Sequence, residues 1–147
     1  MQSGDTCPRE TNPHILPEIL NQLRERPADP LRLGNLWPRR DLVPVEEAAR
    51  AIIDSVDCAP HGVTTINVAT GVARSMQEVI GLLETLLHRR ISVEKDPAKI
   101  RSVERPHLQA DVTRLKNLLG WTPHSDLRRG LGELISAEGL LCAQSHN

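Results

Sequence analysis

The sequence predicts an α/β fold of the α+β-like kind, in which amphipathic helices cover a small, thin sheet of short strands. Three observations indicate this fold. Apolar residues recur at helical spacing in several windows, and short β-branched or alternating stretches lie between these windows. Turns that contain Gly or Pro separate the two kinds of segment. The 147 residues suffice for one domain or for part of a larger one.

The first third of the chain predicts a loop, a helix and two extended pieces. Residues 1–13 are polar and rich in turn formers, which is typical of a loop. Apolar residues at helical spacing predict a helix over 14–26, where Pro17 fits only the first turn. Alternating leucines predict a short strand over 31–33, and residues 42–45 form a second extended piece.

The middle of the chain predicts two helices around one buried strand. Residues 46–56 read as a helix with two acidic residues in its first turn, where the helix dipole favours them. Residues 64–69 (TTINVA) are β-branched and predict a buried strand. Ser75 and Glu78 have the spacing of a capping box, which predicts the start of a helix that runs to His88.

The last third predicts one more strand and two short helices. Residues 91–94 are expected to be a strand, followed by an irregular charged stretch over 95–109. Asp111 is expected to cap a helix that Gly120 ends, and Asp126 to cap the last helix. The predicted organisation is therefore a loop at 1–13, a lobe over 14–141 and a frayed tail at 142–147.

The composition excludes several classes of function. The chain has no Tyr and no Phe, so no mechanism that depends on a tyrosine is available. Only Trp37 and Trp121 could stack on bases, and the net charge is −1, so we expect no nucleic-acid partner. The three cysteines form no CxxC pair, which argues against a disulfide framework or a zinc site and for a reducing compartment.

The terminal segments and common motifs narrow the interpretation further. No apolar run reaches membrane-spanning length and no signal peptide is recognisable, so we expect a cytoplasmic protein without membrane contact. The sequence lacks a GxGxxG turn after a strand, a phosphate-binding GxxxxGK[ST] loop, an HExxH metal motif and a GxSxG elbow. We therefore expect no catalytic residue and no metal ligand in this chain.

Arginines in the segments between predicted elements are the remaining candidates for a binding site. Arg40 lies between two extended pieces, while Arg101 and Arg105 lie in the charged stretch before Asp111. Two segments that each present a guanidinium fork are suited to hold a diphosphate. The alternative from spacing alone is that these side chains are solvated or paired with Glu.

Motifs in consistent order resemble those of the extended short-chain dehydrogenase/reductases, the NAD(P)-dependent nucleotide-sugar epimerases, dehydratases and reductases. The chain is most similar to the GDP-mannose 4,6-dehydratase and GDP-4-keto-6-deoxymannose reductase relatives. The matches span roughly residues 7–136. They are CPRETNPH at 7–14, LGNLWPRRDLVPVEEAARA at 33–51, INVATG at 66–71, SMQEVI at 75–80, DPAKIRSVE at 96–104 and the segment from Ala110 to the LGWTP at 119–123.

The resemblance covers only the C-terminal, substrate-binding half of that family. It implies the C-terminal lobe of an extended Rossmann-type enzyme, without the glycine fingerprint and the YxxxK pair of the family's cofactor-binding half. NAD or NADP is the cofactor of the parent family, and we expect none to be bound by this chain. Segments 41–56 and 64–71 pack against the Rossmann half in the family, so this chain alone is expected to expose apolar surface there.

The resemblance also implies a site for a nucleotide diphosphate-sugar. Arg40 and Arg101 would hold the diphosphate, and Glu104 would accept ribose hydroxyls. Asn35 and Asn67 would donate to the nucleotide or a phosphate. The structural alternatives are that Asn67 ties a strand to a loop and that Glu104 pairs with the neighbouring arginine, Arg105.

Three functions follow as alternatives. In the first, the chain is a fragment, the nucleotide-sugar-binding part of such an enzyme, and is inactive alone. The chain starts inside a family motif, which favours this first hypothesis. The second is half of a split enzyme, completed by a separate Rossmann-domain chain. The third is a free-standing module that binds a nucleotide-sugar or another protein.

Overall fold

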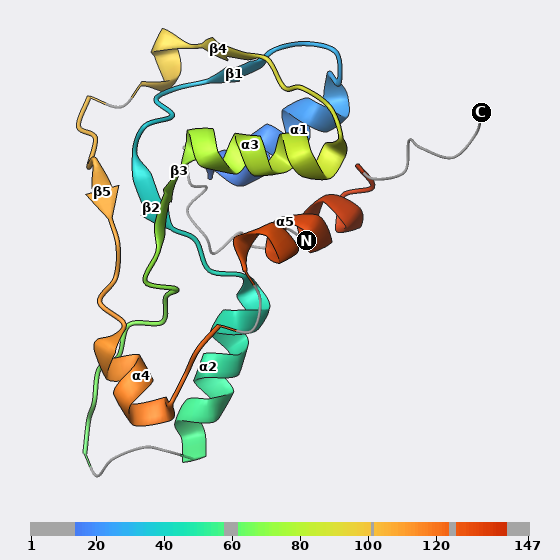
Figure 1. Ribbon diagram of the computed structural model, residues 1–147. Coiled ribbons are helices and arrows are strands. Elements are labelled where there is room, and N and C mark those ends of the chain that lie inside the picture. Colours follow the sequence, from blue (N-terminus) through green and yellow to red (C-terminus); the bar gives the residue numbers. More distant parts are fainter. Residues whose placement is uncertain (1–13, 58–61, 101, 124–125, 141–147) are drawn as a thin grey trace, which may run out of the picture.

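The computed structural model describes residues 14–57, 62–100, 102–123 and 126–140 (Figure 1). The predictions for residues 1–13, for the tail and for Arg101 lie outside this part of the chain. The helices are α1 (Ile15–Glu25), α2 (Val45–Asp57), α3 (Met76–Leu87), α4 (Thr113–Leu119), α5 (Leu127–Ala137) and a 3-10 turn, η1 (Pro97–Lys99). The strands are β1 (Leu31–Leu33), β2 (Arg39–Asp41), β3 (Ala73–Ser75), β4 (Val93–Lys95) and β5 (His107–Leu108).

The strands form two small sheets, which confirms the predicted class of short strands and amphipathic helices. In the three-stranded sheet, β2 lies between β3, to which it is antiparallel, and β5, to which it is parallel. Arg39 is in register with Ser75 on one side and with His107 on the other. The second sheet pairs β1 with β4 in parallel.

The main core lies where α1, α3 and α5 meet β1 (Figure 1). Each helix contributes an apolar stripe at the spacing expected of an amphipathic helix. The fully enclosed side chains include Ile19, Leu31, Leu33, Leu83, Leu131 and Ile135. A smaller cluster of Ala51, Leu115 and Trp121 joins α2 to α4 and is flanked by Ile66 and Val68.

Local capping explains where α3 and α5 begin and where α4 ends. The Ser75 hydroxyl accepts from the Glu78 N–H at 3.2 Å, and the Glu78 carboxylate accepts from the Ser75 N–H at 2.7 Å, which is a complete capping box. Asp126 accepts from the Arg129 N–H at 2.9 Å. Gly120 ends α4 in the left-handed region at φ 58°. Asp111 bonds the Thr113 N–H, although the N-cap position belongs to Val112.

Several strand predictions were wrong because short strands depend on their partners. The extended piece expected at 42–45 lies earlier, at β2, and Val45 already belongs to α2. Residues 64–69 form no strand, because no neighbouring strand in the described part of the chain pairs with them. Arg40 accordingly lies on the central strand of a sheet and not in a loop.

The capping box predicts a pH dependence of stability. Hydrogen bonds from the Ser75 N–H and hydroxyl, followed by those from Arg39, lower the pKa of Glu78 from 4.5 to about 2. A carboxylate with a depressed pKa stabilises the fold above about pH 4.5, and this contribution is lost as the pH falls toward 2. Glu78→Gln is therefore expected to destabilise the protein at pH 6 and to match the wild type near pH 2.

Urea denaturation of both proteins across this pH range measures the difference. Glu25→Gln, which changes an exposed carboxylate at the end of α1, is the control. A Glu78→Gln deficit that stays constant from pH 6 to pH 2 would contradict the expectation.

Candidate functional site

The side chains of β2 connect three separate segments of the chain. Successive residues of a strand point to opposite faces of the sheet, so Arg39 and Asp41 share one face and Arg40 occupies the other. Arg39 reaches the start of α3, Arg40 reaches the segment after η1, and Asp41 reaches the turn before β3. We call these three residues, together with Glu78 and Glu104, the β2 cluster.

Arg40 is held by the segment that precedes β5. Its Nη1 donates to the carbonyls of Arg39 and Arg105, both at 2.9 Å, and its Nη2 lies 3.2 Å from Oε1 of Glu104. The side chains of Arg40 and Glu104 retain 27% and 17% of their exposure, so this ion pair is only partly desolvated. The structural alternative considered for Glu104 was an ion pair with Arg105, but the structure pairs its carboxylate with Arg40.

Arg39 ties β2 to the first turn of α3. Its two terminal nitrogens lie 2.9 and 3.2 Å from the two carboxylate oxygens of Glu78, and Nη2 also donates to the Ala73 carbonyl at 2.9 Å. The Glu78 carboxylate therefore accepts hydrogen bonds both within the capping box and from the Arg39 guanidinium. This arrangement makes Arg39 a fixed part of the scaffold beside Arg40.

Asp41 organises the turn that leads into β3. Its carboxylate accepts from the Thr70 N–H at 3.0 Å, from the Thr70 hydroxyl and from the Gly71 N–H at 2.8 Å. Gly71 has a φ of +78°, a conformation that favours glycine, and a Cβ there would lie 3.0 Å from a methyl carbon of Val112. This role of Asp41 was not predicted from the sequence, where the adjacent polar residues of the RRD segment were the only signal for it.

Of the predicted site residues that lie within the described part of the chain, the structure brings Arg40 and Glu104 together. The amide of Asn67 donates to the Asp111 carbonyl at 3.1 Å, which is the structural alternative considered for it. Asn35 is half-buried between β1 and β2 and has no hydrogen bond to Arg40 or Glu104 within the described residues. Arg101 lies outside those residues.

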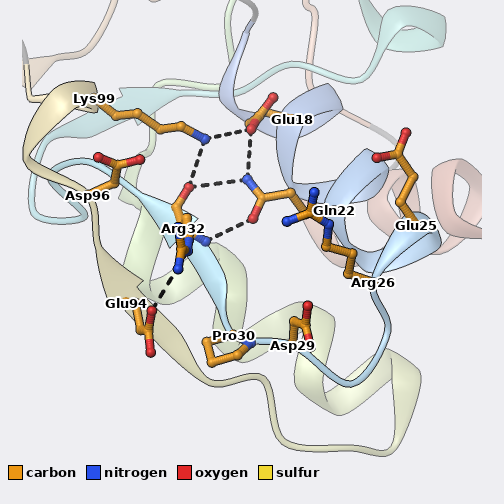
Figure 2. Close-up of a pocket in the computed structure, with 10 residues that line it drawn as sticks. All are labelled: Glu18, Gln22, Glu25, Arg26, Asp29, Pro30, Arg32, Glu94, Asp96 and Lys99. Atoms are coloured by element: carbon orange, nitrogen blue, oxygen red, sulfur yellow. Dashed lines mark hydrogen bonds and ion pairs between the residues drawn. The ribbon is translucent and has the colours of Figure 1, made fainter.

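A pocket of about 430 Å³ lies elsewhere, between α1, β1, β4 and η1 (Figure 2). Lys99 Nζ lies 2.6 Å from the Glu18 carboxylate and donates to the Arg32 carbonyl at 2.9 Å. The Gln22 amide donates to the same carbonyl at 3.1 Å and accepts from the Arg32 N–H at 2.8 Å. These bonds, drawn in Figure 2, fasten α1 and η1 to β1.

The charge of this pocket is unsuited to a nucleotide diphosphate. Five carboxylates and three basic side chains line it, so its net charge is negative and repels phosphate. None of the five predicted site residues lines it. The lining residues are Glu18, Gln22, Glu25, Arg26, Asp29, Pro30, Arg32, Glu94, Asp96 and Lys99. We therefore regard the β2 cluster as the candidate site and the pocket as a structural joint.

The described residues contain neither a candidate metal site nor a candidate membrane-spanning helix. No group of three or more His, Cys, Asp or Glu side chains there is arranged to hold a metal ion. No helix in the same residues is long and apolar enough to cross a membrane.

Known proteins with similar sequences and structures share this architecture. GDP-6-deoxy-D-mannose reductase from Pseudomonas aeruginosa is 25% identical over 109 residues, which are 74% of this chain and 36% of the reductase. The crystal structure of a "putative epimerase" from Burkholderia cenocepacia J2315 superposes with a TM-score of 0.77 at 28% identity, over 88% of this chain and 42% of that one.

A second similar structure contains both a cofactor and a nucleotide-sugar. MoeE5 in complex with UDP-glucuronic acid and NAD has a TM-score of 0.68 at 25% identity, and the match covers 80% of this chain and 38% of that chain. The chain thus spans about two fifths of the length of these relatives. The family model described as GDP-mannose 4,6 dehydratase matches residues 3–134, and the chain belongs to that family.

Proposed function

We propose that this chain is the nucleotide-sugar-binding part of an NAD(P)-dependent nucleotide-sugar epimerase, dehydratase or reductase, and that it has no activity alone. The observation that supports this most is the pairing of Arg40 with Glu104 in a chain of this family. A guanidinium on the central strand faces a carboxylate on a second segment, and both stay accessible to solvent. The guanidinium of Arg40 supplies the positive charge needed to bind a diphosphate, and the carboxylate of Glu104 can accept hydrogen bonds from ribose hydroxyls.

Arg40 has the donors needed to bind a phosphate in its present position. A guanidinium carries five N–H donors, and the bonds to two carbonyls and to Glu104 occupy three of them. The carbonyl bonds fix the plane of the fork, which lowers the entropic cost of binding a phosphate bidentately. In this proposal Arg101 is the second diphosphate contact, Glu104 accepts from the ribose, and Asn35 and Asn67 are polar neighbours of the nucleotide.

The proposal predicts that a polypeptide of these 147 residues catalyses no NAD(P)-dependent turnover. The reason is chemical, because the chain contains no tyrosine to act as acid or base and no glycine fingerprint for a dinucleotide. The measurements are NADPH absorbance at 340 nm for a reductase reaction, which consumes the cofactor, and chromatography of the sugar-nucleotide products for epimerase and dehydratase reactions, which regenerate it. Cofactor-dependent turnover by the purified chain would overturn this part of the proposal.

A second prediction concerns binding. Arg40→Ala is expected to weaken the binding of GDP-mannose or UDP-glucose at least about tenfold, about 1.4 kcal/mol, because a charge-assisted bidentate contact is lost. Arg40→Lys keeps the positive charge but loses the forked guanidinium, so its affinity is expected to lie between those of the wild type and Arg40→Ala. Arg101→Ala is expected to weaken binding in the same direction.

Isothermal titration calorimetry with each sugar nucleotide measures these affinities. Arg32→Ala is the matched control, since its guanidinium lies outside the β2 cluster and its ion pair with Glu94, at 3.9 Å, is exposed. Equal affinity for the wild type and the Arg40 and Arg101 variants would show that the diphosphate site lies elsewhere.

A further inference from the structure

The face of the three-stranded sheet that carries Arg40 has a second guanidinium. The register of β2 and β3 places Arg74 directly opposite Arg40. Residues in register on neighbouring strands point to the same face of a sheet, and in antiparallel pairs their Cβ atoms lie about 4.5–5.5 Å apart. The burial pattern agrees, because Ala73 and Ser75 are 5% and 8% exposed on the opposite face, whereas Arg74 is half-buried. Arg74 and Arg40 therefore lie side by side.

Arg74 differs from the other arginines of this sheet in having no carboxylate partner. Arg39 lies 2.9 Å from the Glu78 carboxylate. Arg40 lies 3.2 Å from the carboxylate of Glu104. The Arg74 side chain forms no hydrogen bond and no ion pair within the part of the chain that the structure describes. Its positive charge is thus partly desolvated and is not compensated.

The neighbouring positions on this face do not neutralise the charge. The strands β3, β2 and β5 lie side by side (Figure 1), and Arg40 is in register with Leu108 on its other side. Across the three strands the face therefore presents two arginines and an apolar residue that is 41% exposed. Among the described residues, Glu104 is the carboxylate paired with these arginines, so one positive charge remains.

Two like charges directly opposite each other are unfavourable for the sheet. Cross-strand pairs of like charge destabilise the pairing of their strands, and burial increases the cost of an unpaired charge. An anion that lies between Arg40 and Arg74 would remove both costs, because each guanidinium would gain a partner of opposite charge. The juxtaposition therefore favours a bound anion on this face.

We infer that Arg74 is a further diphosphate contact and that it forms, with Arg40, a clamp for the two phosphates of a nucleoside diphosphate. This inference rests on the proposed function, and it adds to Arg40 and Arg101 a residue that the resemblance does not imply. Guanidinium forks bind phosphate oxygens bidentately, so two forks on neighbouring strands suit two linked phosphates. Strand pairing fixes both Cα positions before the ligand arrives, which lowers the entropic cost of binding.

The salt dependence of stability tests whether the two charges are close. Arg74→Gln removes the charge and keeps much of the side-chain stem. Its stability relative to the wild type is expected to fall as NaCl rises from about 0.01 M to about 1 M, because salt screens the repulsion that the wild type retains. Urea denaturation without ligand measures this change. A difference in stability that is independent of salt would indicate packing alone and would overturn the inference.

Calorimetry with GDP-mannose and with inorganic pyrophosphate tests the clamp itself. Pyrophosphate has two linked phosphates but lacks the sugars and the base. Arg74→Ala is expected to weaken the binding of both ligands at least about tenfold, because a charge-assisted bidentate contact is lost. Arg74→Lys keeps the charge but loses the fork, so its affinities should be intermediate. Arg32→Ala, on a strand of the other sheet, is the control and should bind as the wild type does.

The two ligands also separate this inference from the proposed function. Pyrophosphate binding that depends on Arg74, without binding of GDP-mannose, would support the clamp and contradict the nucleotide-sugar site. GDP-mannose binding that is weakened in Arg40→Ala and unchanged in Arg74→Ala would do the reverse. A wild-type chain that binds neither ligand would contradict both.

Discussion

Leu83→Ala is expected to lower the free energy of unfolding by about 2–5 kcal/mol, because it removes the Cγ and both Cδ carbons and leaves a cavity in the main core. Leu83 is fully buried on α3, within the core that also contains residues of α1, α5 and β1. Neighbours on several rigid elements cannot collapse into the space, so the loss should lie in the upper part of this range.

Urea denaturation followed by circular dichroism measures the Leu83→Ala effect. Leu118→Ala is the control, since Leu118 lies on α4 with 38% of its surface exposed and should cost much less. Equal losses for the two variants would mean that the helices of the main core are not packed as described.

Asp41→Ala is expected to lower the free energy of unfolding by about 2–4 kcal/mol, because three donors lose one carboxylate. The Thr70 N–H and hydroxyl and the Gly71 N–H all converge on Asp41, and each would be left without this acceptor. The turn that feeds β3 into the sheet depends on these bonds, so β2–β3 pairing should weaken with them.

The conservative change Asp41→Asn refines this prediction. The amide oxygen can still accept from Thr70, whereas the amide nitrogen cannot accept from the Gly71 N–H, so an intermediate loss is expected. Chemical denaturation gives the stabilities, and hydrogen exchange at Gly71 reports the local bond. Protection at Gly71 that survives Asp41→Ala would show that the carboxylate does not hold the turn.

Helices were predictable because their determinants are local. The capping box at Ser75 and Glu78 and the glycine at 120 each define a terminus within four residues of sequence. Strands of two or three residues carry no such signal. Residues 73–75 and 107–108 became strands only because both lie against β2, and the more β-branched residues 64–69 did not because nothing in the described chain pairs with them.

The candidate site was predictable in part for the same reason. Arg40 stands in a recognisable motif, and Glu104 in another, so both could be named before their contact was known. The roles of Arg39 and Asp41 could not be predicted in this way, because they follow from the strand register that places Ser75 beside Arg39. Such a register joins residues far apart in the chain, so no local motif predicts it.

The strand pairings also determine when each sheet can form during synthesis. Arg40 bonds Arg105, 65 residues further along the chain, and β1 pairs with a strand that begins at Val93. Closing such long loops costs entropy before any contact compensates for it, which slows folding. The ribosome must therefore synthesise residues 93–95 before β1 can pair with β4, and residues 107–108 before β2 has its second partner, β5. Until then, α1, β1 and β2 lack a completed core. Apolar surface is exposed at this stage, and chaperones commonly bind nascent chains in this state.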